Sequence, residues 1–485
     1  MKLVTLSLIV SAALGTAKSP NVLFLIADDL TYTALSCYGN KVCVTPNIDR
    51  LAARGTLFTR AYCQATFCGP SRASLMFGFY PQSTSSFGYE SGRGAVGPDR
   101  LSWAQNFKQQ GYHTARISKI FHMGVPGDIE RGTDGTDDPA SWTEKHNSKG
   151  PEWSAPGDGE TLETRSRNAS SPTAELLAST QAAKGGNTFV VVEAAGDDMV
   201  HSDGKSAAKA IELIHSYKNL DQPFWLGVGF VRPHVPFVAP SSYFTSFKPY
   251  QKIELPEKFP GDWCDIPASG INYCTSENMH MDVRKQKKAI GGYFASVAYM
   301  DAQVGKVLDA LEATGQDKNT IVIFTSDHGF HLGEHDFWAK VSLHEESARV
   351  PLIISAPGKQ AQRCESFVEL LDLYPTTSKM CSVEYSDELQ GKNIAPMLDD
   401  PNYTIRSDAL SANQGGSLYR NDRWALIVYR DGSELYDMHK DPKQYTNLAA
   451  NPEYAEVLKE MLAAKKSRLA TIPRLLATRK KPLPN

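Results

Sequence analysis

Apolar runs alternate with amphipathic segments along most of the chain. Residues 21–27 are almost uniformly apolar and end at Asp28 and Asp29, a pattern typical of a strand buried on both faces. Comparable runs predict strands at residues 56–62, 112–117, 224–230, 320–325 and 350–355. Helical spacing and Gly or Pro boundaries predict helices at residues 46–54, 70–76, 100–110, 207–218, 290–312 and 367–380. This alternation predicts an α/β layer fold with a largely parallel sheet.

Two stretches depart from the alternation. Residues 128–185 are rich in Gly, Asp, Ser, Thr and Pro, and we expect long surface loops there. Residues 417–436 contain strand-like runs broken at Asn421-Asp422 and Asp431-Gly432, which are typical hairpin turns, and residues 452–467 then predict a helix. We therefore expect a large domain at 18–400 and a small α+β domain with an antiparallel sheet at 401–485.

The N-terminus has the pattern of a secretory signal. Lys2 precedes an apolar run at residues 3–14 and the small residues Gly15-Thr16-Ala17, so residues 1–17 predict a signal peptide cleaved after Ala17. The run is too short for a membrane span, which needs about 20 residues. We expect an exported protein without a membrane span, extracellular, lysosomal or periplasmic according to its source. Asn168 and Asn402 lie in glycosylation acceptor patterns.

Composition narrows the class of protein. The 485 residues carry 51 Lys and Arg against 54 Asp and Glu, a formal net charge of −3, and 41% are hydrophobic. These values are typical of a globular protein and exclude a disordered chain, a collagen-like fibre or a cysteine-stapled miniprotein. Without a basic excess, a nucleic-acid binder that relies on bulk charge is also excluded.

Polar residues gather at the ends of the predicted strands. They are Asp28, Asp29, His234, Asp327 and His328. The carboxyl ends of parallel strands meet at one edge of a sheet, where open α/β folds place their sites. The Asp pair alone favours a helix cap or a solvated loop. Two acidic strand ends together predict a site for a hard divalent cation, Ca²⁺ or alternatively Mg²⁺.

A second group of residues suits an anion. Cys68 begins a predicted helix, whose N-terminus attracts negative charge, and Arg72 adds a planar donor fork. From this spacing, a reactive and a structural role for Cys68 are about equally supported. Lys119, His122, His234 and Lys340 are further basic residues. Together with a cation, they predict a pocket that hydrolyses phosphate or sulfate esters.

The pentad Cys68-Gly69-Pro70-Ser71-Arg72 resembles the signature of type I sulfatases, in the alkaline-phosphatase superfamily. Nearly the whole mature chain shares the resemblance. Residues 119–122, 233–237, 293–297 and 332–340 are most similar to the iduronate 2-sulfatase branch. The resemblance implies an alkaline-phosphatase-like sandwich, in which helices flank a large, mostly parallel sheet. It also implies a sulfated saccharide substrate, either a glycosaminoglycan or another polysaccharide.

The resemblance implies a formylglycine (3-oxoalanine) mechanism. A sulfatase-modifying enzyme would oxidise Cys68 to the aldehyde, which hydrates. One hydroxyl would attack sulfur, and loss of a proton from the other would expel sulfate. The implied ligands of Ca²⁺ are Asp28, Asp29, residue 68, Asp327 and His328.

The resemblance also implies roles for the basic residues. His234 would donate a proton to the leaving oxygen, and Lys119 and Lys340 would bind sulfate oxygens. Arg72 would orient the hydrated aldehyde, and His122 is a candidate base for sulfate release. Three more residues are candidates for sugar recognition, with structural support as an equal alternative: Arg232, His331 and His335.

Some residues depart from the family pattern. Phe77 and Phe79 replace polar residues after the pentad, which bears on conversion of Cys68, and Ser118 replaces the usual Gly before Lys119. Two alternatives stay open: a phosphomonoester or phosphonate hydrolase of the same superfamily, and an inactive sulfatase-like binding protein. The sequence gives no oligomeric state.

The remaining cysteines suggest disulfides, which an exported chain can form. Cys264 and Cys274 share one loop region, and Cys364 and Cys381 flank one predicted helix, so these are the predicted pairs. The three cysteines left over, an odd number, are Cys37, Cys43 and Cys63.

Overall fold

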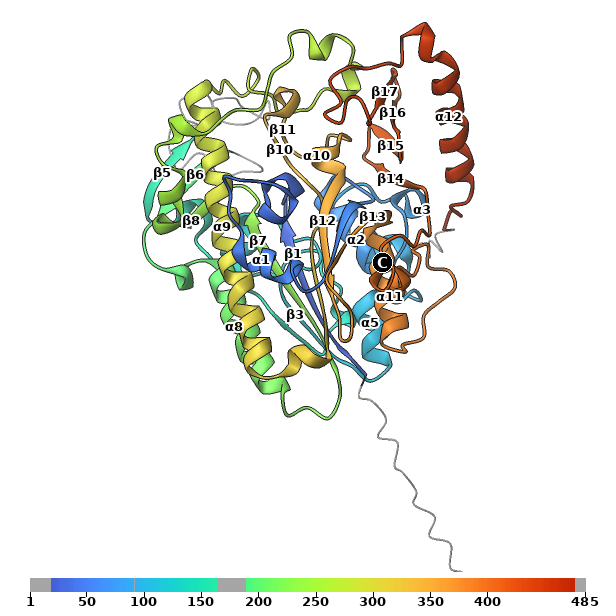
Figure 1. Ribbon diagram of the computed structural model, residues 1–485. Coiled ribbons are helices and arrows are strands. Elements are labelled where there is room, and N and C mark those ends of the chain that lie inside the picture. The colour runs from blue at the N-terminus through green and yellow to red at the C-terminus, as the bar shows by residue number, and fades with distance from the viewer. Residues whose placement is uncertain (1–18, 91, 164–188, 476–485) are drawn as a thin grey trace, which may run out of the picture.

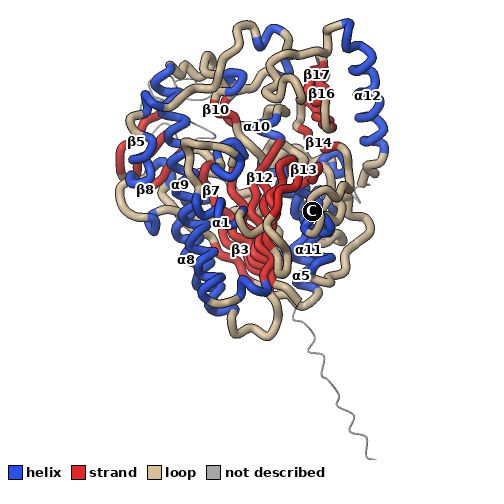
Figure 2. The backbone as a smooth tube through the Cα atoms, viewed as in Figure 1, coloured by secondary structure: helices blue, strands red, loops and turns tan. Residues whose placement is uncertain are grey.

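The centre of the computed structural model, which describes residues 19–90, 92–163 and 189–475, is an eight-stranded sheet (Figures 1 and 2). Its order is β13-β2-β12-β9-β1-β7-β3-β4, and within it β12 alone runs antiparallel to its neighbours. The strands are β1 (Asn21–Asp28), β2 (Thr56–Tyr62), β3 (His113–Ser118), β4 (Glu144–His146), β7 (Phe224–Pro233), β9 (Thr320–Ser326), β12 (Arg349–Ser355) and β13 (Gln362–Glu369). The prediction of a mostly parallel sheet is confirmed.

Helices cover both faces of this sheet, because successive residues of its buried strands point to opposite sides (Figure 1). On β1, Leu23 and Leu25 share a core with α8 and α9, whereas Val22 and Phe24 share the other core with α2, α5 and α11. The helices are α1 (Pro46–Ala52), α2 (Cys68–Phe77), α3 (Pro81–Thr84), α4 (Gly92–Val96), α5 (Trp103–Gln109), α6 (Gly127–Arg131), α8 (Ser202–Tyr217), α9 (Val283–Ala313), α10 (Glu345–Ala348), α11 (Leu373–Met380) and α12 (Ala455–Ala470).

One predicted helix is partly wrong. Residues 367–369 belong to β13, and only the later part of the expected 367–380 helix is helical, as α11. Phe367 and Val368 pair in parallel register with Arg60 and Ala61 of β2 and point into different cores. Sheet pairing at this edge therefore overrides the continuous apolar run that indicated a helix.

The C-terminal region forms the predicted antiparallel sheet. Its strands are β14 (Asp408–Ala412), β15 (Gly416–Asn421), β16 (Trp424–Tyr429) and β17 (Ser433–Asp437), and α12 packs against β16 (Figure 1). A bridge between Ala65 and Ala412 joins it to the larger part. Leu418 and Ile427 share a core with Phe367 and Leu343. The two parts are therefore packed against each other.

Residues 128–185, expected to be surface loops, contain regular structure where the chain is described. Besides β4, they include β5 (Gly157–Thr161), which pairs with β6 (Val190–Ala194), and β6 pairs with β8 (Phe237–Pro240). A hairpin of β10 (His331–Leu332) and β11 (Trp338–Ala339) completes the sheets. Residues 1–17 and Asn168 lie outside the described residues, and Asn402 is exposed. Among the described helices, none combines the length and apolar character that crossing a bilayer requires.

The predicted disulfides are wrong: no disulfide joins any of the eight cysteines. Cys264 is exposed whereas Cys274 is fully buried. The Cys364 thiol, on the edge strand β13, faces the carbonyl of Pro401 at 3.3 Å, and the Cys381 thiol, after α11, faces that of Pro20 at 3.6 Å. Nearness in the sequence did not bring these sulfur atoms together.

Candidate functional site

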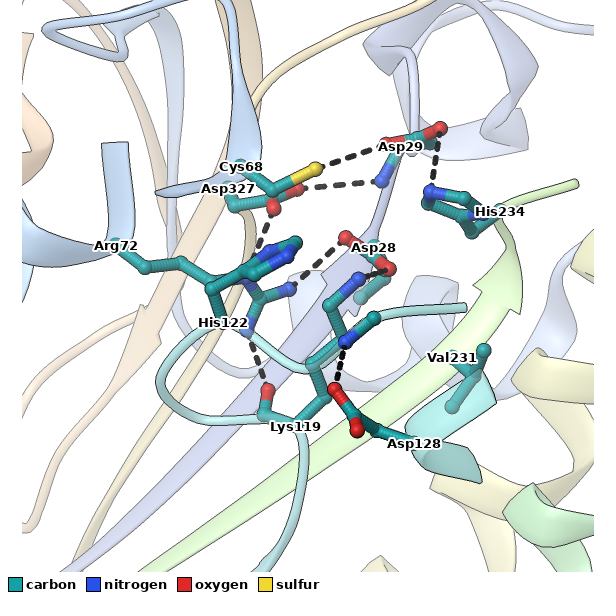
Figure 3. A network of polar contacts seen from close by, with 12 residues as sticks. Asp28, Asp29, Cys68, Arg72, Lys119, His122, Asp128, Val231, His234 and Asp327 are labelled. Atoms are coloured by element: carbon teal, nitrogen blue, oxygen red, sulfur yellow. Dashed lines mark hydrogen bonds and ion pairs between the residues drawn. The ribbon is translucent and has the colours of Figure 1, made fainter. Parts of the chain in front are cut away.

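Four adjacent strands in the middle of the sheet end at one edge and supply most of the predicted site. Asp28 and Asp29 end β1, Asp327 and His328 follow β9, His234 follows β7, and Lys119 follows β3. These side chains are buried and face one another (Figure 3). One ligand atom each from Asp28, Cys68 and Asp327 lies within 4.8 Å of the others, and so do those of Asp29, Cys68 and His328.

Two positively charged side chains, Arg72 and Lys119, lie behind the carboxylates. Arg72 reaches from α2, where its Nε donates to Asp327 at 2.9 Å and its Nη2 to Asp28 at 3.2 Å (Figure 3). Lys119 Nζ donates to the other oxygen of Asp28. Burial raises the pKa of Asp28, but the charges of Lys119 and Arg72 outweigh burial and hold it well below its ordinary value. Asp28 is therefore ionised.

The Cys68 thiol is the first side chain of α2 and is fully buried. Lys340 Nζ lies 3.1 Å from its sulfur, and His328 Nε2 lies 3.3 Å away. Burial raises the pKa of the thiol, but Lys340, Lys119 and His328 outweigh burial and leave it below the ordinary value. Residue 68 is thus at the centre of a positively charged pocket.

Asp29 is held differently from Asp28. Its carboxylate accepts hydrogen bonds from Lys340 Nζ at 2.8 and 3.0 Å, yet burial, with Cys68 and Asp28, raises its pKa to about 7. Burial lowers the pKa of His328, but Asp327 and Cys68 outweigh burial and raise it to about 9. Crowded buried acids, of which Asp29 resists ionisation, are a donor set that a divalent cation would stabilise, and His328 would join that set only on losing its Nε2 proton to the ion.

His234 is neutral in this arrangement. Its Nδ1 faces the carbonyl of Val235 at 2.5 Å, so Nε2 is left for the site, where it lies 3.0 Å from Lys340 Nζ. Burial, and then the charge of Lys340, lowers its pKa well below the ordinary value. Arg232, a candidate for either sugar recognition or structural support, is buried in an ion pair with Glu152, and its Nη1 donates to the carbonyl of His234 at 2.7 Å. Arg232 thus positions the His234 loop.

Local backbone geometry aims these side chains. Three non-glycine residues in or before the site have left-handed backbone: Asp29 (φ 62°), Ser118 (φ 56°) and Ala339 (φ 69°). Ser118 precedes Lys119 and Ala339 precedes Lys340. Glycine adopts this left-handed conformation without strain, which is the physical reason for the Gly that the family resemblance implies at position 118. A Cβ on Gly229 of β7 would lie 2.2 Å from the carbonyl of Lys119, so this strand must leave room for the Lys119 turn.

Comparison with known proteins agrees with this geometry. The family model described as Sulfatase matches residues 20–382, and one described as N-sulphoglucosamine sulphohydrolase, C-terminal, matches residues 333–470. The chain belongs to the sulfatase family. It is 30% identical over 463 residues to a protein named sulfatase from Formosa agariphila, covering 91% of this chain and 86% of that one. To the iduronate 2-sulfatase of Homo sapiens it is 34% identical over 387 residues, 76% of this chain and 65% of that one.

Solved structures share the fold. A phosphonate monoester hydrolase of Agrobacterium radiobacter aligns with a TM-score of 0.75 and 22% identity, covering 96% of this chain and 99% of that one. A 2-O GAG sulfatase aligns with a TM-score of 0.69 and 22% identity, covering 94% and 92%. The predicted sandwich fold is therefore the fold of this sulfatase.

The other two candidates for sugar recognition lie in a separate buried group, the histidine cluster (His331, His335 and His344). The rings of His335 and His344 lie 4.6 Å apart, and those of His331 and His344 6.2 Å. His335 Nδ1 lies 2.9 Å from Asp262, and His344 Nε2 lies 2.9 Å from Glu434 of the C-terminal sheet. These partners differ from those of the candidate catalytic centre, the group at the strand ends that contains Asp28, Asp29, Cys68, Asp327 and His328.

Two site residues were missed by sequence reasoning. Tyr293 of α9 accepts a hydrogen bond from the Thr31 backbone and donates one at 2.7 Å to the carbonyl of Asp29, which fixes the turn after β1. It stands in the quoted run at 293–297, but a tyrosine on a buried helix face is usually read as core. Tyr89 stacks on His122 with ring centroids 4.2 Å apart, and no pattern in the sequence marks it.

Proposed function

We propose that this sulfatase hydrolyses sulfate esters of sulfated sugars, with Ca²⁺ bound at the strand ends and residue 68 converted to formylglycine. The observation that carries the proposal is the position of Cys68, buried at the start of α2 with Lys340 Nζ at 3.1 Å and His328 Nε2 at 3.3 Å. A structural cysteine needs no such surroundings. An oxygen-centred group formed from it would lie among cations.

The donor set fits a hard cation. Asp28, Asp29 and Asp327 are fully buried, and carboxylate oxygens are the ligands that Ca²⁺ prefers. The raised pKa of Asp29, about 7, indicates that this carboxylate needs more positive charge than Lys340 supplies. Asp28, Asp29, Asp327 and His328 would hold the ion, which would supply Lewis-acid polarisation of a sulfate oxygen.

The basic residues would then act on the substrate. With the carboxylates of Asp28 and Asp29 neutralised by a cation, the ammonium groups of Lys119 and Lys340 gain freedom to bind sulfate oxygens. Arg72 keeps its two carboxylate partners and holds the start of α2 in place. Formylglycine would supply a hydrated aldehyde as nucleophile and a route for expelling sulfate.

Proton donation by His234 would depend on substrate. The imidazole is neutral here because burial and Lys340 disfavour its charged form. A bound sulfate monoester adds negative charge next to Nε2, which raises the imidazole pKa and lets Nε2 carry the proton that the leaving oxygen requires. Burial and Lys119 lower the pKa of His122 to about 2, so the imidazole is neutral and its unpartnered Nδ1 is a weak base here; it would act as a base only once the negative charge of a bound sulfate raises that pKa.

The sugar substrate is proposed from the relatives. Iduronate 2-sulfatase and a 2-O GAG sulfatase are named for sulfated sugars, and the first is 34% identical to this chain. Residues 1–17 would direct export, and a sulfatase-modifying enzyme would act on Cys68. Because this chain shares its fold with a phosphonate monoester hydrolase, any test of substrate should also include phosphorus esters.

The deciding experiment combines mass and turnover. Protein made with a formylglycine-generating enzyme should show, in the peptide that contains Cys68, the mass loss of thiol-to-aldehyde conversion. The converted protein should release sulfate from a panel of sulfated saccharides and turn over phosphate or phosphonate monoesters far more slowly. An unmodified thiol in active material would refute the mechanism, and preference for phosphorus esters would refute the substrate class. Phe77→Thr, which restores a polar residue at one of the two positions after the pentad that depart from the family pattern, is the comparison variant for the extent of Cys68 conversion.

A further inference from the structure

Tyr89 is an exposed aromatic residue beside the catalytic centre that the mechanism leaves without a role. Its ring stacks on His122 at 4.2 Å and packs at a tilt on Phe67 at 4.6 Å, so Phe67, Tyr89 and His122 form an aromatic stack. Even so, 46% of Tyr89 remains exposed. A tyrosine held on two rings and still open to solvent presents a fixed, partly apolar surface.

The chain holds Tyr89 in place by short-range contacts. The Glu90 carboxylate accepts hydrogen bonds from the Gly88 backbone at 3.0 Å and from Ser86 at 3.1 Å, which closes the turn around Tyr89. This turn lies directly on the start of α2: a Cβ on Gly69 would be 2.5 Å from the Gly88 carbonyl and 3.3 Å from Tyr89 Cα. The glycine next to Cys68 thus lets the turn approach the nucleophile.

The Tyr89 ring adjoins the proposed catalytic centre through its stack on His122. Partial burial raises the pKa of the Tyr89 phenol, and the negative charges of Cys68 and Asp29 add to the rise while Lys340 opposes it. Beneath it, His122 Nδ1 is buried without a partner. A ligand that occupies the sulfate pocket would therefore extend past the Tyr89 ring as it leaves residue 68.

We propose that Tyr89 packs against the pyranose ring that carries the scissile sulfate, and so makes this sulfatase selective for cyclic sugar esters. The inference rests on the proposed function. The C–H groups on a pyranose face carry partial positive charge and suit the negative face of an aromatic ring, whereas the sulfate is bound by cations. Ring and ester would thus be recognised by different residues.

The test is binding to the full-length mature protein with Cys68→Ala, which cannot turn over. The probes are N-acetylglucosamine 6-sulfate, galactose 6-sulfate, a 2-sulfated uronic acid disaccharide and inorganic sulfate. In this background, Tyr89→Ala should weaken the tightest-binding sugar sulfate about tenfold and change sulfate affinity less than twofold. Tyr89→Phe should bind like the parent. Tyr403→Ala, at a remote tyrosine that is 44% exposed, is the matched control.

Three results would overturn the inference. They are equal weakening of sugar sulfates and inorganic sulfate by Tyr89→Ala, unchanged sugar affinity in that variant, and sugar sulfates that bind the parent no better than sulfate does. Equal weakening would assign Tyr89 to support of His122 instead. Failure of the proposed function gives a separate signal, because the converted wild-type enzyme would then release no sulfate from any saccharide.

Discussion

One segment, residues 327–348, contributes to two buried groups that contain histidines and acids, the catalytic centre and the histidine cluster. In the catalytic centre, Nδ1 of His328 faces its neighbour's carbonyl at 2.8 Å, and Nδ1 of His234 does the same, so both Nε2 atoms face the site. In the histidine cluster, side chains hold the rings: His335 on Asp262 and His344 on Glu434.

The surroundings of the buried charges distinguish a ligand-binding site from a group that stabilises the fold. In the catalytic centre, Lys119, Lys340 and Arg72 gather around acids that are themselves crowded, and Asp29 resists ionisation. Such an arrangement is completed by a ligand. In the histidine cluster, His344 pairs with Glu434 inside the protein, and this pair joins the 327–348 segment to the C-terminal sheet. Buried charge and unpartnered polar atoms therefore do not mark function by themselves; the gathering of several cations around carboxylates and residue 68 does.

The largest expected effect is in the catalytic centre. Lys340→Met removes the ammonium that contacts both Asp29 and residue 68, so kcat for a sulfated sugar should fall about 10²- to 10³-fold. Steady-state kinetics of the converted enzyme measures this. Lys306→Met is the control, since Lys306 also pairs with an aspartate, Asp198, but is exposed. A tenfold or smaller loss for Lys340→Met would contradict the role in charge stabilisation.

Removing a member of the histidine cluster should lower the free energy of unfolding and leave kcat nearly unchanged. His344→Ala leaves Glu434 buried without its histidine partner, so the free energy of unfolding should fall by about 3 kcal/mol. Denaturant unfolding measures the loss, and kcat of the folded enzyme at low temperature should stay within twofold. A large drop in kcat with unchanged stability would place His344 in the catalytic centre.

The same pair predicts a pH dependence. Burial raises the pKa of Glu434, but the charge of His344 outweighs burial and holds it below 4.5. An acid whose pKa is depressed in the folded protein stabilises the fold at pH values above its ordinary, unfolded-state pKa. This contribution disappears as the pH falls through the pKa of the folded state. Glu434→Gln should therefore have a lower free energy of unfolding than wild type at about pH 6, and the difference between the two proteins should be smaller at about pH 3.5. A gap that is constant across this range would exclude the ionised pair.

The smallest effect is expected at His335. Its Nε2 has no partner and its Nδ1 is bound by Asp262, so His335→Ala should destabilise the protein by about 1 kcal/mol. We expect KM for a sulfated sugar to change less than twofold, as measured beside wild type. A tenfold rise in KM without loss of stability would restore His335 as a sugar-binding residue.

Much of the site could be predicted because strand ends obey a simple rule. Asp28, Asp327, His234 and Lys119 follow buried strands, and parallel strands bring such positions to one edge. The position of Arg72 behind the carboxylates follows from its place one turn into α2. These features depend on local pattern and sheet direction, both of which the sequence carries.

Other features depend on contacts that no pattern records. Tyr89 reaches the site because Gly69 allows the backbone of the turn at Gly88 to come close to the start of α2. For Arg232 the sequence left sugar recognition and structural support as equal alternatives, and the ion pair with Glu152, 80 residues earlier, is what favours support. The cysteine pairs were wrong because spacing along the chain says nothing about the distance between sulfur atoms. Long-range packing decides each case.

The direction of β12, the antiparallel strand of the eight-stranded sheet, has a consequence for motion. Because β12 pairs directly with β9, the 327–348 segment leaves the sheet and returns to it at neighbouring strands, as a closed loop whose ends are about 5 Å apart. Such a loop can open while the eight strands stay paired. Lys340 and the histidine cluster would then lose protection together, so their amides should exchange hydrogen at one common rate, faster than those of β1.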